Sequence, residues 1–377
     1  MNVLRYYGRR TLAALRNMRT RGYAPLAAVL IHLPRATLLR GWRIFARGVN
    51  RSAPVRKLNE RSLRRMHAVD PDHAAGGHFY VIVMPGTLHF LLPCLALLPS
   101  GVRVRLIANG ARGWERRMLA RWFPALPLCR LRTLPWTSAT HGDVISLLLA
   151  TNRGNFGLID HDCYVFDPTL FTDLDPGPGQ CLTAIWGGTS EKTGLTYPET
   201  YFLYLATTVL QEIAARYRVD ARNYRVIPAH LRPVIARMGV VGGVFVKDHA
   251  TFFDTLHLML MLAIGEGYDF RFLQCTDERS ITHLGGTSWR TEETKDLIDC
   301  YRDWRFLERV DDAQLRRRYA RRFRPFRSAI DVRAVMPMTP RNFDLMTRLD
   351  ELVDRLGASI ARCRPTPAAG ASASHTD

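Results

Sequence analysis

The first pattern in this chain is an alternation of short apolar runs and helical segments between residues 78 and 160. Apolar runs rich in β-branched and aromatic residues predict strands at 79–84, 102–107, 129–133 and 156–159. Helical patterns lie at 114–122 and 143–150, and residues 88–98 are helical or loop-like. Strands that alternate with helices pair as a parallel sheet and bind ligands at the strand carboxyl ends. The pattern therefore predicts an α/β fold with its site at that edge.

Both ends of the chain have helical patterns outside this alternation. Leu38, Trp42 and Phe45 recur at helical spacing, with arginines on another face. Such a cationic amphipathic helix either lies in a membrane interface or packs on the next domain with its arginines solvated. Residues 299–324 are also helical and very basic, and the residues after Cys363 have the composition of a disordered tail.

These features divide the chain into four regions. We expect a basic helical extension at 1–77, a catalytic domain at 78–295, a basic helical region at 296–363 and a disordered tail at 364–377. The turn-rich residues at the end of the first region form the expected linker. No stretch approaches the roughly 20 apolar residues that a membrane-spanning helix needs.

The positive charge of the chain is concentrated at one end. The 377 residues carry a net charge of +19, of which +13 lies in the first 77 residues, with no acidic residue before Glu60. Residues 78–295 carry only +2, although nucleic-acid binding would place basic residues and aromatics on the folded domain. We therefore expect no specific nucleic-acid partner, and an anionic membrane surface contacted through residues 1–59.

The cysteines point to a reducing compartment. The seven cysteines are odd in number, widely spaced and contain no CxxC pair, which argues against a disulfide framework or a zinc site. The start of the chain also lacks a clean signal peptide. We expect a cytoplasmic protein, peripheral at the inner face of the membrane.

The sharpest chemical signal is the pair Asp160 and Asp162, which follows the apolar run 156–159. In a parallel sheet both would stand at a strand's carboxyl end, about 6 to 7 Å apart along the chain. Two carboxylates there suit a hard divalent cation that binds phosphate oxygens as its remaining ligands. By strand alternation, His161 should point away from them and have a supporting or structural role.

Together with these acids, residues 78 to about 290 resemble the nucleotide-sugar-dependent glycosyltransferases of the GT-A fold, family 2 type. Four blocks carry the resemblance in the family's order. They are the strand that ends at Pro85 and Gly86, the strand and turn 106–110 with Asn109, His141-Gly142 before the Asp-x-Asp strand, and the segments 241–246, 253–256, 267–268 and 281–286.

The resemblance implies an α/β GT-A fold with a mostly parallel central sheet and helical extensions at both ends. It implies a nucleotide-sugar donor, a glycan or lipid-linked acceptor, and Mn²⁺ or Mg²⁺ on the donor diphosphate. Asp160, Asp162 and His283 would hold the metal, and Asp254 would be the general base of an inverting transfer. The residues implied on the donor side are Pro85, Gly86, Asn109, Gly142 and Asp160. The family usually has an acid where this chain has Asn109, and two acids near the base.

Each of these residues also has a structural interpretation. Asp254 could cap the helix that follows it, His283 could lie in a turn, and Asn109-Gly110 is a turn signal. Trp186 could stack on a sugar or pack in the core. Two other functions compete: a phosphohydrolase using the acids 160, 162 and 167 with His283, and a basic nucleic-acid or membrane-binding protein without catalysis. The histidines are scattered along the sequence, which argues against the hydrolase, because a two-metal site needs several histidines and acids close together.

Overall fold

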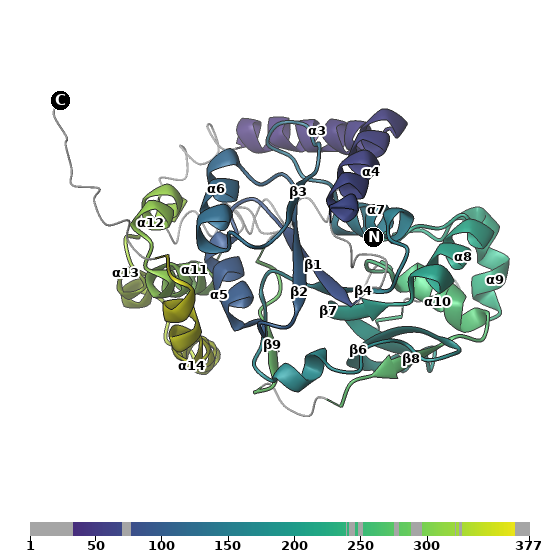
Figure 1. Cartoon of the computed structure of the whole chain (residues 1–377). Helices are drawn as coiled ribbons and strands as arrows, with labels where there is room; N and C mark the ends of the chain where they lie inside the picture. The colour runs from purple at the N-terminus through teal and green to yellow at the C-terminus, as the bar shows by residue number, and fades with distance from the viewer. Residues whose placement is uncertain are drawn as a thin grey trace.

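The computed structural model describes residues 33–69, 77–238, 240, 246–247, 252–274, 279–287, 296–320, 322–323 and 326–365. Within them a seven-stranded sheet has the order β3-β2-β1-β4-β7-β6-β8 (Figure 1). Its strands are β1 (His78–Val83), β2 (Arg103–Ala108), β3 (Leu128–Arg130), β4 (Phe156–Ile159), β6 (Gln180–Thr189), β7 (Thr196–Leu205) and β8 (Asp269–Phe272). A second, two-stranded sheet pairs β5 (Cys163–Val165) with β9 (Ile281–His283).

Most strand pairs of the large sheet are parallel. Strand β1 pairs in parallel with β2 and β4, β2 with β3, and β6 with β8. The direction changes at β7, which runs antiparallel to both β4 and β6. The predicted α/β class with a mostly parallel central sheet is confirmed. The predicted strands lie within a few residues of β1 to β4.

Helices cover both faces of the sheet. The helices are α3 (Leu33–Asn50), α4 (Ala53–Ala68), α5 (Leu88–Leu97), α6 (Gly113–Trp122), α7 (His141–Thr151), α8 (Thr207–Tyr217), α9 (Arg232–Ala236), α10 (His257–Gly265), α11 (Leu297–Val310), α12 (Ala313–Ala320), α13 (Ala329–Val335) and α14 (Pro340–Cys363). Strand alternation divides the core: Phe79 and Val81 of β1 pack with α5, α11 and α14, whereas Tyr80 and Ile82 pack with α7 and α10. The sheet is thus the middle of three layers.

The basic helix expected at 299–324 is two helices. Helix α11 ends at Val310, because the next residue, Asp311, has the left-handed backbone with φ of 51°. Helix α12 then begins at Ala313. A left-handed residue cannot continue a helix, and periodicity alone did not reveal this break.

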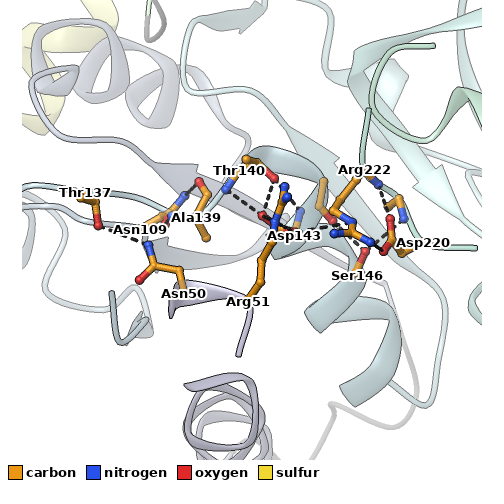
Figure 2. Close-up of polar contacts among 12 residues, drawn as sticks. Asn50, Arg51, Asn109, Thr137, Ala139, Thr140, Asp143, Ser146, Asp220 and Arg222 are labelled. Atoms are coloured by element: carbon orange, nitrogen blue, oxygen red, sulfur yellow. Dashed lines mark hydrogen bonds and ion pairs between the residues drawn. The ribbon is translucent and has the colours of Figure 1, made fainter. Parts of the chain in front are cut away.

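The N-terminal helices are attached to the rest of the protein by polar contacts (Figure 2). Asn50 Nδ2 donates to Thr137 Oγ1 at 3.2 Å, and Asn50 Oδ1 accepts from the amide of Leu134 at 3.0 Å. The Arg51 guanidinium contacts the Asp143 carboxylate at 3.0 Å. These contacts hold the end of α3 against the loop that leads into α7.

Some predictions concern residues outside the described part of the chain. They include most of the linker at 70–77, the apolar segment 241–245, and the tail from residue 366 onward. Among the described helices, none has both the length and the apolar character that a membrane span requires.

Candidate active site

The Asp-x-Asp segment lies where β4 ends and β5 begins. The amide of Asp160 donates to the carbonyl of Tyr201 on β7 at 2.9 Å, which continues the β4–β7 pairing by one residue. Strand β9 pairs antiparallel with β5, so that His283 stands opposite Cys163. The amide of Leu284 donates to the carbonyl of Asp162 at 3.2 Å. Two backbone pairings therefore bring His283 to the two acids, more than 120 residues away in the sequence.

Asp160, Asp162 and His283 form one cluster of ligand atoms. His283 Nε2 lies 3.6 Å from Asp160 Oδ2 and 3.4 Å from Asp162 Oδ1. One ligand atom from each of the three residues lies within 4.8 Å of the other two. Two carboxylates and one imidazole at this spacing fit a divalent cation such as Mn²⁺ or Mg²⁺ that also binds phosphate oxygens.

Asp162 is held ionised by its surroundings. It is 2% exposed, and burial alone would raise its pKa. The electrostatic interaction with His161 and the hydrogen bonds from His283 and Thr287 outweigh that effect and hold the pKa of Asp162 below its ordinary value. Thr287 Oγ1 donates to Asp162 Oδ2 at 2.7 Å, and His161 Nε2 lies 2.8 Å from the same hydroxyl. His161 thus supports the carboxylate through Thr287 and is not one of the three residues that form the ligand cluster.

The ring of His283 is held by stacking against Tyr201 and by its contact with Asp162. Tyr201 stacks on it with ring centroids 4.4 Å apart. Burial lowers the pKa of His283, but its hydrogen bond to Asp162 and the charges of both acids raise the pKa above the ordinary value. The turn interpretation of His283 does not hold, because the residue ends strand β9.

Asp254 does not cap the following helix. Helix α10 begins at His257, and its N-cap is Leu256, which has a φ of 68°. Asp254 instead lies beside Lys247, whose Nζ is 3.8 Å from Asp254 Oδ2 and 3.7 Å from Glu199 Oε2. The charge of Glu199 acts on His283. Lys247 therefore lies between the predicted base and Glu199.

His141 and Glu199 lie at this site, although no role was predicted for either of them from the sequence. His141, the first residue of α7, has its Nε2 3.5 Å from Asp160 Oδ1. Glu199 lies on β7 and faces Lys247. The only sequence signal for His141 was its place in the His141-Gly142 block, and Glu199 had none, since an isolated acid in a strand is common.

Asn109 and Gly142, which were predicted on the donor side, have structural contacts within the protein. Both ends of the Asn109 amide bond to the backbone of Ala139, at 2.9 and 2.8 Å, and the side chain is fully buried. A Cβ on Gly142 would stand 2.4 Å from the carbonyl oxygen of Ala221, so this glycine allows α7 to pack closely. Contact of Asn109 or Gly142 with a nucleotide stays a prediction.

Pro85 and Gly86 form the turn after β1. Gly86 has a φ of 83°, its amide donates to Glu115 Oε1 at 2.7 Å, and its carbonyl accepts from Arg322 Nη1 at 3.0 Å. The positive φ favours glycine at this position. These contacts orient the turn at the carboxyl end of the sheet, and its role in donor binding also stays a prediction.

Asp167 and Trp186 lie outside the ligand cluster. Asp167 is engaged at the N-cap of the short 3₁₀ helix Pro168–Phe171, where its side chain accepts from the amide of Thr169. Among the described residues, the ligand cluster consists of Asp160, Asp162 and His283, without Asp167. The four-residue set considered for a phosphohydrolase is therefore incomplete. Trp186 is 58% exposed, which excludes its packing in the core.

Comparisons with known proteins agree with the predicted enzyme class. Residues 56–210 match the family model of the StrH glycosyltransferase N-terminal domain. No curated protein matches the chain. Among solved structures, the chain is similar to S. aureus TarS 1–349 in complex with UDP-GlcNAc, with 12% identity, 74% of this chain and 81% of that chain covered, and a TM-score of 0.29. A likeness of this size says nothing about function. The family match, by contrast, covers residues 56–210, which include β1 to β5 and the Asp-x-Asp segment, and it supports the predicted enzyme class, a glycosyltransferase.

Proposed function

We propose that this glycosyltransferase moves a sugar from a nucleotide-diphosphate donor to a glycan or lipid-linked acceptor. The observation that carries the proposal is the cluster of Asp160, Asp162 and His283 at the carboxyl end of β4. This is the edge of a parallel sheet where ligands bind. The cluster fits Mn²⁺ or Mg²⁺, and a cation there would neutralise the charge that develops on the leaving diphosphate.

The chain's own residues prepare this site for a cation. Asp162 stays ionised in a buried position because Thr287 and His283 donate to it. Tyr201 keeps the His283 ring in one orientation. His141 stands on the other side of Asp160, at the start of α7. The ligand atoms are therefore largely preorganised, which lowers the cost of binding.

Asp254 supports an inverting displacement. Its carboxylate would accept the proton of the acceptor hydroxyl as the new acceptor oxygen–carbon bond forms and the carbon–oxygen bond to the diphosphate breaks. Lys247 contacts the carboxylates of Asp254 and Glu199, and the charge of Glu199 acts on His283. Attack from the face opposite the leaving group inverts the anomeric carbon in one step.

The experiment for this proposal is isothermal titration of the protein with UDP and GDP, with and without Mn²⁺. We expect one of the nucleotides to bind only when Mn²⁺ is present, because the diphosphate completes the ligand set. Binding that is equally strong without the metal would contradict the proposed site. A product assay then separates transfer from hydrolysis: release of free sugar in the presence of every acceptor tested would favour a hydrolase.

Lys247 is expected to act as a positioning residue. Replacing it with methionine, Lys247→Met, removes the cation between Glu199 and Asp254 but keeps the length of the side chain. We expect kcat to fall about 10- to 100-fold, since a displaced base is poorly aligned, with the donor KM nearly unchanged. Lys247→Arg, which keeps the charge, should restore most of kcat. Equal losses in both variants would contradict this role.

Metal affinity should depend on pH through His283. Its pKa is raised by the neighbouring acids, so the imidazole is protonated more readily than an ordinary histidine and must lose that proton to bind a metal. Mn²⁺ affinity is therefore expected to weaken as the pH falls, by up to about tenfold per unit below that pKa. Titrations at pH 6 and pH 8 test this. The variant His283→Gln should bind Mn²⁺ more weakly and with a flatter pH dependence, and an unchanged dependence would exclude His283.

A further inference from the structure

Helix α3 presents an apolar surface that the described part of the protein does not cover. Leu38 is 75% exposed, Ile44 66% and Phe45 60%. Gly41 and Gly48 lie on the same helix, and apart from their chain neighbours and the backbone of α3 itself, no atom of the described residues comes within 4 Å of the place where their Cβ would stand. We call Leu38, Ile44 and Phe45 the α3 face. The opposite side of α3 is buried through Ala46 and Asn50.

A second exposed aromatic residue lies beside α3. Trp136 is 90% exposed and has a φ of 58°, at the turn after Leu134. The neighbouring Pro135 accepts a hydrogen bond from Trp42 of α3 at 3.2 Å. Asn50 of α3 also contacts Leu134 and Thr137, so the turn is held against α3 from both sides of Trp136. Figure 2 shows the contact between Asn50 and Thr137. Trp136 therefore belongs to the same side of the molecule as α3.

The surroundings of this surface are strongly basic. Residues 33–68, which include α3 and α4, contain ten Lys and Arg residues and one acidic residue, a net charge of +9. Arg43 and Arg47 of α3 are exposed. A second copy of this chain would bring a second set of these charges to the same interface, and like charges repel. Exposed aromatic and aliphatic residues next to arginines are typical of helices that lie in the interface of an anionic bilayer.

We propose that the α3 face and Trp136 dock on the surface of an anionic lipid bilayer. The apolar side chains enter the boundary between headgroups and acyl chains, where tryptophan is favoured. The arginines contact the anionic headgroups. Helix α3 lies along the top of the molecule in Figure 1, so that it can lie flat on such a surface without unfolding the domain.

The turn that contains Trp136 lies close in sequence to a residue of the active site, His141. Trp136 and His141 are five residues apart, which limits their Cα separation to about 18 Å. His141 lies 3.5 Å from Asp160. This step rests on the proposed function: a docked bilayer would present a lipid-linked acceptor next to the donor site. The docking itself does not depend on it.

The experiment is co-sedimentation of the full chain with vesicles of phosphatidylcholine alone or with 30% phosphatidylglycerol. We expect binding to the anionic vesicles only, with a loss of binding at high salt. Phe45→Glu and Trp136→Glu should each weaken the partition coefficient about tenfold, because a carboxylate replaces an inserted ring. The matched control is Phe343→Glu on α14, whose side chain is 56% exposed, similar to Phe45, and which should bind like wild type.

Three results would overturn the docking proposal. The first is anionic-vesicle binding by both Phe45→Glu and Trp136→Glu at the wild-type level. The second is equal binding to neutral vesicles. The third is a wild-type dimer in light scattering that Phe45→Glu converts to a monomer, which would identify a second copy as the occupant. Thermal melting checks that each variant is folded. If Phe45→Glu does not fold, the vesicle experiment with Trp136→Glu still tests the proposal. Mn²⁺-dependent nucleotide binding should be unchanged in these variants, so this proposal can fail while the proposed function stands.

Discussion

The variant Asp162→Asn is expected to lose Mn²⁺-dependent nucleotide binding and to transfer sugar about 10³-fold more slowly than wild type. Asp162 is 2% exposed and within 3.4 Å of His283, so its carboxylate is the most enclosed of the cluster's ligands. Asparagine has nearly the same shape and can still accept the hydrogen bond from Thr287. The substitution therefore removes the charge without opening a cavity. Titration of nucleotide with and without Mn²⁺, followed by a transfer assay, measures both effects.

The control for this variant is Asp167→Asn. Asp167 lies a few residues further along the same segment, but it is only half-buried and caps a short 3₁₀ helix. Asparagine caps a helix about as well as aspartate, so the change should leave both the stability of the protein and metal binding nearly unchanged. Mn²⁺-dependent nucleotide binding by Asp162→Asn at the wild-type level would exclude Asp162 as a metal ligand, since no other buried carboxylate of the described cluster could replace it.

The variant Asp254→Asn is expected to bind donor and Mn²⁺ normally but to lower kcat by roughly 10² to 10⁴, the usual contribution of a general base. Its carboxylate is 39% exposed and lies 3.8 Å from Lys247. Because the residue is open to solvent and caps no helix, the amide should leave the fold unchanged. Steady-state kinetics of transfer, together with titration of the nucleotide, separate a loss in chemistry from a loss in binding.

Glu199→Gln provides the comparison for Asp254. Both acids contact Lys247, but only Asp254 is proposed to accept the acceptor's proton. We expect kcat to fall less in Glu199→Gln than in Asp254→Asn. In Glu199→Gln, kcat should still decrease at low pH, whereas in Asp254→Asn this decrease should disappear. Full activity of Asp254→Asn would remove this residue from the mechanism. A larger loss in Glu199→Gln would make Glu199 the better candidate for the base.

Part of the site could be predicted because its signal is local. Asp160 and Asp162 directly follow a run of apolar residues, and both the strand and the edge of the sheet can be inferred from that pattern. The capping box of Thr140 and Asp143 at the start of α7 is also a local feature, because the two residues are three positions apart in the sequence. His283 and Asp254 were assigned only through the family resemblance, because nothing near them in the sequence indicates a site.

The remaining features depend on contacts between distant segments. Glu199 reaches Lys247, and His141 reaches Asp160, only after β7 and α7 have packed beside β4. Asn109 had a plausible position for a nucleotide contact, but its amide is used by the backbone of Ala139, 30 residues away in the sequence. Polar side chains that become buried need partners, and those partners are known only once the chain is folded.

The sequence by itself determined the α/β class, the strands β1 to β4, the two acids after β4 and the concentration of positive charge in the first 77 residues. These follow from composition and from short-range periodicity, which burial imposes on every strand and helix. Only the tertiary structure decided that His283 joins the acids through the β5–β9 pairing, and that Lys247 stands between Asp254 and Glu199. It also decided which side of α3 stays exposed beside Trp136. Such contacts depend on which elements become neighbours, and a local pattern contains no information about its partner.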